Sequence, residues 1–120
     1  MIWLLLTMTA TQAPSTNPAT YLALEVTHHK IRLADMQTRL QDEHPALVRK
    51  RRQIEVLEKA AAKQDGEVDQ QLIESAITMA IVKAEMNLEL LQIGLHETHL
   101  RVQFEKQRLA NLKELRDADR

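Results

Sequence analysis

The sequence predicts an all-α protein built as one long antiparallel helical hairpin, with its two helices paired as in a coiled coil. Apolar residues recur at heptad spacing through residues 18–63 and again through residues 68–117. Gly66 and Gly94 are the only glycines, and Gly66 lies between the two patterned segments, where we expect a turn at residues 64–67. A two-helix hairpin buries little surface, which favours assembly into a four-helix bundle or a larger oligomer.

Composition fits a single small folded domain of 120 residues, with 44% hydrophobic and 28% charged residues. The net charge of −1 lacks the positive excess of a phosphate-binding surface, so nucleic acid is not an expected partner. Cysteine is absent, which excludes disulfides, thiolate metal sites and cysteine nucleophiles.

The N-terminal residues 1–13 form an apolar stretch that runs into small and polar residues. This pattern is typical of a signal peptide cleaved after Ala13, and it predicts a periplasmic or secreted protein. No Lys or Arg precedes the apolar run, so an apolar tail on a cytoplasmic protein stays open as the alternative. The run is shorter than the roughly 20 residues of a membrane-spanning helix, so membrane contact is expected only through this segment. Residues 14–17 have the composition of a linker.

The first helix is expected over residues 18–63, with Asn17 as its N-cap and Pro18 as its first residue. Pro45 removes one backbone hydrogen bond and predicts a kink between Asp42 and Pro45, across which the heptad phase continues. The predicted seam of this helix is Val26, Leu33, Leu40, Leu47, Ile54 and Ala61, with Leu22, Met36 and Leu57 at the d positions.

The second helix, expected over residues 68–117, completes the hairpin of residues 18–118 and is the more apolar of the two. Its predicted seam is Ile81, Leu88, Leu95, Val102 and Leu109, with Ile77, Ala84, Leu91 and Leu112 at the d positions. A separate apolar stripe follows the opposite face: Met79, Met86, Leu90, Ile93, Leu100 and Phe104. A helix with one partner normally keeps its outer face polar, so this stripe predicts an interface with a second copy, a dimer being favoured, or with another helical protein.

Three histidines and one glutamate are the candidate metal ligands. Glu25 and His28 have the Glu-x-x-His spacing of carboxylate-bridged metal sites in helical bundles, and His96 and His99 are three residues apart. A hairpin that turns at Gly66 would bring both pairs to the same end. Such a site needs two Glu-x-x-His segments and two further glutamates, whereas the chain offers one segment, so solvated surface histidines are the simpler interpretation. No cofactor is expected.

The basic run at residues 49–52 spreads around the whole circumference of a helix, so it makes no single basic face. We expect it to be solvated and paired with acidic residues of the second helix. The chain shows no Ser/His/Asp set and no glycine-rich phosphate loop, and we therefore do not expect an enzyme.

The segment LQDEHPALV at residues 40–48, followed by RQIEVLE at residues 52–58, resembles part of the periplasmic coiled coils of bacterial polysaccharide chain-length determinant and export proteins. In those proteins a His-Pro pair and aliphatic residues precede a similar helix. They are anchored by membrane helices at both ends, and no second hydrophobic segment follows Leu115 here, so anchoring and chain-length control are not carried over. The resemblance implies a bacterial extracytoplasmic coiled coil.

Taken together, these patterns predict a non-enzymatic extracytoplasmic coiled-coil module that self-associates or docks on a partner. The alternative is a periplasmic helical hairpin that senses or buffers a metal.

Overall fold

The computed structural model describes residues 17–119, and every regular element in that range is an α-helix. The elements are α2 (Pro18–Met36), α3 (Pro45–Ala62), α4 (Gln70–Gly94) and α5 (Leu100–Asp119). The predicted all-α class is confirmed. The single long hairpin is not confirmed, because each predicted helix is divided in two. The longest extent of the molecule is 56 Å, whereas a helix of about 45 residues would span about 65 to 70 Å at 1.5 Å per residue.

The start of the first helix agrees with its prediction. The Oδ1 atom of Asn17 accepts a hydrogen bond from the backbone N–H of Thr20 at 2.8 Å, and Pro18 is the first helical residue. The predicted signal peptide or tail at residues 1–13 lies outside the described residues, as does the predicted linker apart from Asn17.

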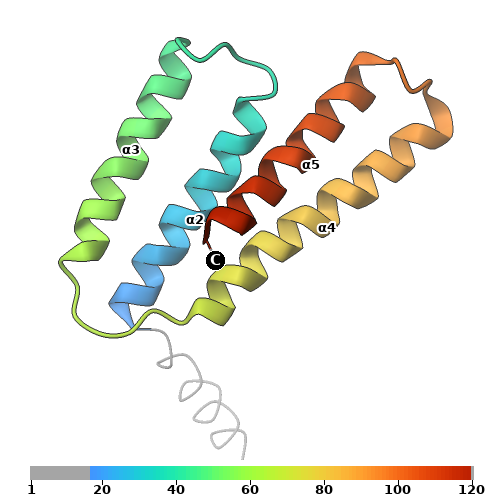
Figure 1. Cartoon of the computed structure of the whole chain (residues 1–120). Helices are drawn as coiled ribbons and strands as arrows, with labels where there is room; N and C mark the ends of the chain where they lie inside the picture. The colour runs from blue at the N-terminus through green and yellow to red at the C-terminus, as the bar shows by residue number, and fades with distance from the viewer. Residues whose placement is uncertain (1–16, 120) are drawn as a thin grey trace, which may run out of the picture.

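The four helices form two antiparallel hairpins, α2 with α3 and α4 with α5 (Figure 1). Helix α2 packs against all three others, whereas α3 packs against α2 alone. Helix α4 runs in the same direction as α2, and α5 runs back along both of them (Figure 1). Helix α2 therefore joins the two hairpins.

The prediction of one continuous helix over residues 18–63 is wrong, since the chain reverses direction between Met36 and Pro45. A proline disfavours helical backbone at the residue before it, and His44 has φ −58° and ψ 133°. The Nδ1 atom of His44 then accepts a hydrogen bond from the backbone N–H of Ala46 at 3.1 Å, which caps α3. We expected a kink in one helix beside this proline, but the chain makes a complete turn there and begins a new helix.

The helix predicted over residues 68–117 is also divided, without a proline at the break. Helix α4 ends at Gly94, a residue of low helix propensity, and Leu95 follows with an extended backbone, φ −127° and ψ 147°. The backbone N–H of His99 donates to the carbonyl of His96 at 2.9 Å, and α5 begins directly afterwards.

The turn around Gly66 links α3 to α4, but these two helices do not pack against each other. The link passes beside the start of α2, where the Asn17 amide donates to the carbonyl of Glu67 at 2.9 Å. The Thr20 hydroxyl accepts a hydrogen bond from the backbone N–H of Asp69 at 3.0 Å. Gly66 has φ +109°, a backbone conformation that residues with a side chain rarely adopt. The predicted turn therefore fixes α4 to α2, and not to α3.

The antiparallel register also differs from the one that a hairpin turning at Gly66 would have. The Asn111 amide donates to the carbonyl of Ala34 at 3.1 Å, and Nε of Arg108 lies 3.6 Å from a carboxylate oxygen of Asp35. A hairpin turning at Gly66 would place Glu97 near Ala34. That register is wrong because the second half turns back after α4.

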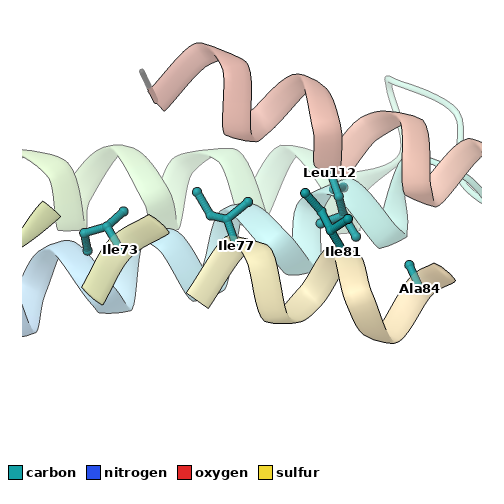
Figure 2. Close-up of a cluster of buried hydrophobic side chains, with 6 residues drawn as sticks. Ile73, Ile77, Ile81, Ala84 and Leu112 are labelled. Atoms are coloured by element: carbon teal, nitrogen blue, oxygen red, sulfur yellow. The ribbon is translucent and has the colours of Figure 1, made fainter. Parts of the chain in front are cut away.

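The main core lies where α2, α4 and α5 meet. Its buried cluster comprises Ala34, Ile73, Ile77, Ile81, Ala84 and Leu112 (Figure 2). The α4 members recur every three or four residues, which places them on one face of the helix. Several members of the two predicted seams are buried: Val26, Leu47, Ile54, Ile77, Ile81, Ala84, Val102 and Leu112. The heptad pattern thus identified much of the buried surface correctly.

Replacing Ile77 with Ala should lower the free energy of unfolding by about 2 to 5 kcal/mol, because this side chain is 1% exposed and its truncation leaves a cavity. Val56→Ala is the control, since Val56 is 52% exposed on α3 and its truncation should cost less than about 0.5 kcal/mol. Urea denaturation followed by circular dichroism measures both. Equal losses would contradict the position of the core.

Candidate interaction surface

The side of α4 that points away from the core is apolar and exposed. We define the outer face of α4 as five residues that are each more than half exposed: Met79, Val82, Met86, Leu90 and Ile93. They are spaced by three or four residues, so they share one side of the helix. The buried isoleucines of α4 lie on the opposite side. Within residues 17–119, no other helix covers the outer face.

The interface predicted from the sequence overlaps this face without matching it. Leu100 is 62% exposed but lies beyond the turn, at the start of α5, and Phe104 is half-buried. Val82 belongs to the face and was not predicted. Its position, three residues after Met79 and four before Met86, was the signal that could have identified it.

The four candidate metal ligands are not gathered in one place. Glu25 and His28 are exposed on α2, whereas His96 and His99 lie in the turn between α4 and α5. In the part of the chain that the structure describes, no group of three or more His, Asp or Glu side chains is placed to hold a metal ion. The predicted convergence depended on a hairpin turn at Gly66.

The turn histidines instead accept hydrogen bonds from the backbone. The Nδ1 atom of His99 accepts from the N–H of Arg101 at 3.1 Å, and that of His96 accepts from the N–H of Thr98 at 3.2 Å. His44 makes the same kind of bond at the start of α3. In all three contacts the ring nitrogen is the acceptor for a backbone N–H at or beside a helix start.

His29 belongs to α2 and faces α3. Its Nδ1 atom is 3.1 Å from Nζ of Lys50, and its Nε2 atom is 3.9 Å from a carboxylate oxygen of Glu25. Burial lowers the pKa of His29, the charges of Lys50, Arg32 and His28 lower it further, and the charge of Glu25 opposes them. The neutral ring is the form that accepts a hydrogen bond from the Lys50 ammonium.

The basic run at residues 49–52 forms its ion pairs within the first half of the chain. Arg51 lies 3.4 Å from Asp42, and Arg52 lies 3.2 Å from Glu55. The predicted pairing with acidic residues of the second half is wrong, because α3 packs only against α2.

An open groove of about 370 Å³ follows α2 between α3 and α5, and no pattern in the sequence predicted it. It forms because α3 and α5 both pack on α2 but not on each other. Apolar and charged side chains contribute to its lining, including Leu33, Ile54, Leu115, Lys30, Arg51 and Glu114. This mixture identifies no particular ligand.

No protein-family model, curated protein sequence or solved structure matches the chain. Among the helices of the described residues, none combines the length and the apolar character needed to cross a membrane.

Acidification should destabilise the fold through His29. Because the pKa of His29 is lower in the folded state than its ordinary value of 6.5, the unfolded chain takes up the proton first as the pH falls. The stability gained from the neutral ring is therefore complete above about pH 6.5 and is lost as the pH falls towards the folded-state pKa. Thermal melts at pH 7.5 and 5.5 should show a smaller loss of Tm for His29→Gln than for the unchanged protein.

His28→Gln is the matched control for this pH dependence. The His28 ring is exposed on α2, and its charge is the smallest contribution to the lowered pKa of His29, so the variant should keep nearly all of the original loss of Tm. An unchanged loss in the His29→Gln variant would contradict the assignment.

Proposed function

We propose that this protein is a non-enzymatic structural or interaction module that self-associates through the outer face of α4. The exposure of five large apolar side chains on one helix face is the observation that carries this proposal. Contiguous exposed apolar surface is typical of a protein interface. The occupant we propose is the same face of a second copy, so that two α4 helices pair as in a coiled coil.

The dimensions and chemistry of the face suit this partner. From Met79 to Ile93 it runs about 21 Å at 1.5 Å per residue, and removing apolar surface from water is favourable by about 25 cal/mol per Å². The methionines Met79 and Met86 are flexible side chains that can adapt to an identical surface. A net charge of −1 gives two copies little mutual repulsion.

The roles of the histidines support a non-catalytic function. His44, His96 and His99 accept hydrogen bonds from the backbone at the starts of α3 and α5 or in the turn before α5. His29 is held beside Lys50 between two helices. These contacts assign the rings to helix ends and helix packing.

An extracytoplasmic location forms part of the proposal. The apolar run at residues 1–13 and the resemblance at residues 40–58 both favour it. N-terminal sequencing of the protein isolated from its native cells tests the location. A chain that begins directly after Ala13 would support export, whereas an intact Met1 on protein recovered from the cytoplasm would contradict it.

Replacing Leu90 and Ile93 together with Glu should abolish self-association, since burying two carboxylates at an apolar interface is strongly unfavourable. Both side chains are exposed in the single chain, at 60% and 81%, so the variant should fold with an unchanged helical content. Sedimentation equilibrium over a range of concentrations should give a dimer for the unchanged protein and a monomer for the variant.

A charge-matched control separates the apolar face from the added charge. Gln53→Glu with Gln64→Glu adds the same two negative charges at exposed positions outside α4 and should still dimerise. If the unchanged protein were monomeric at every concentration, the proposal would be wrong.

A further inference from the structure

The apolar side chains of the outer face of α4 fit a second copy in either direction. The five residues of the face are spaced by 3, 4, 4 and 3 positions, and this spacing reads the same from both ends. The α4 helix of a second copy can therefore cover the face in a parallel or in an antiparallel pair. Charged residues beside the face distinguish the two arrangements.

The two edges of the outer face carry opposite charges. Met86 lies on the midline of the face, because an α-helix turns about 100° per residue. Glu85 and Glu89 lie about 100° and 60° from this midline on one side, which we call the acidic edge. Lys83 lies about 60° from the midline on the other side, which we call the basic edge. All three charged side chains are exposed.

These charges are available to a partner. Within residues 17–119, the ion pairs of the chain involve none of the three side chains. On the basic edge, the exposed Arg101 of α5 lines a hollow beside Asn87 of α4. Glu105 lines the same hollow, but it pairs with Arg108 of its own helix at 3.0 Å. Arg101 therefore adds to the positive charge of this edge.

Symmetry decides which edges meet when two α4 helices pair. Two identical chains that associate through the same surface are related by a two-fold axis. In a parallel pair the axis runs along the helices, so the acidic edge of each copy meets the basic edge of the other. In an antiparallel pair the axis runs across the helices, so each edge meets itself. Sliding one helix along the other does not change which edges meet.

The charges therefore favour the parallel pair. In register, Glu85 of one copy and Lys83 of the other lie about 3 Å apart along the axis, within reach of their long side chains. An antiparallel pair centred on Met86 would instead gather Glu85 and Glu89 of both copies on one edge, within about 9 Å along the axis. Opposite charges beside a helical seam set the orientation of coiled coils, and facing like charges are unfavourable.

We propose that two copies of this chain associate with their α4 helices parallel and in register, and that Lys83, Glu85 and Glu89 set this orientation. This inference rests on the proposed self-association and specifies how the second copy is placed. The apolar outer faces of both copies are covered in this dimer, and its charged edges are paired on both sides.

The parallel dimer has two different ends. Helix α2 begins beside the start of α4, where the backbone N–H of Asp69 donates to the Thr20 hydroxyl (Figure 1). Asn17 of both copies therefore lies at one end of the dimer, and both turns between α4 and α5 lie at the other. A partner that docks on either end would meet two copies of the same surface.

Charge reversal tests the orientation. Lys83→Glu places a carboxylate opposite the acidic edge of the other copy, so the dimerisation constant of a parallel pair at low salt should fall about ten-fold. Adding Glu85→Lys reverses the closest pair and should recover most of this loss. In an antiparallel pair each edge would still meet itself, so Lys83→Glu would leave the constant unchanged or raise it. Sedimentation equilibrium measures the constants.

Arg49→Glu is the control for net charge. It makes the same change of charge on α3, which packs only on α2, so it should leave the dimerisation constant unchanged. High salt screens exposed charges and should reduce the effect of Lys83→Glu.

Disulfide trapping measures the orientation directly. The chain has no cysteine, and exposed Ser75, four residues before Met79, extends the outer face at one end as Ile93 does at the other. In a parallel pair equal positions adjoin, so Ser75→Cys and Ile93→Cys should each form a disulfide between copies under mild oxidation. In an antiparallel pair centred on Met86, equal positions would be about 33 and 21 Å apart along the axis, so only a mixture of the two variants would be joined.

Disulfides within each single variant, together with the weakened dimer of Lys83→Glu, would support the proposed orientation. Disulfides that formed only in the mixture would show that the orientation is wrong. An undiminished constant for Lys83→Glu would show that these charges do not set it. The proposed function would stand in both of those cases, whereas an unchanged protein that stayed monomeric at every concentration would contradict both proposals.

Discussion

Packing of α2 against all three other helices is the contact on which the rest of the structure depends. At its start, Asn17 and Thr20 hold the segment that leads into α4, and near its end Ala34 is buried against α4 and α5. The short side chain of Ala34 allows close approach, and its carbonyl accepts a hydrogen bond from Asn111. Because α2 occupies the centre, α3 and the outer face of α4 remain at the edges.

The sequence predicted which residues are buried better than it predicted where the chain turns. Ile77, Ala84 and Leu112 could be assigned to the core because apolar periodicity records which face of a helix is covered. Periodicity does not record chain direction, and the heptad phase is the same before and after both hairpin turns. Pro45 indicated the first turn, although only as a kink. At the second turn the only local signal is Gly94, and a single glycine inside an apolar helical pattern is tolerated, so this turn was missed.

The candidate surface shows the same division between local and long-range information. Exposure of Met79, Met86, Leu90 and Ile93 agrees with the sequence because it depends only on positions along one helix. The groove along α2 and the capping roles of the histidines depend on where α3 and α5 turn back. Those features could not be obtained from spacing alone, and the predicted convergence of Glu25, His28, His96 and His99 failed for the same reason.

Self-association through α4 is tested most directly by the oxidation of its methionines. Met79 and Met86 are 56% and 53% exposed in the single chain, and peroxide converts accessible methionine to its sulfoxide. Oxidation of both, followed by mass spectrometry, should slow several-fold as the protein concentration rises through the dimerisation range. Met36, half-buried on α2, should oxidise at a constant rate. Rates at Met79 and Met86 that do not change while dimers form would show that the outer face of α4 is not the interface.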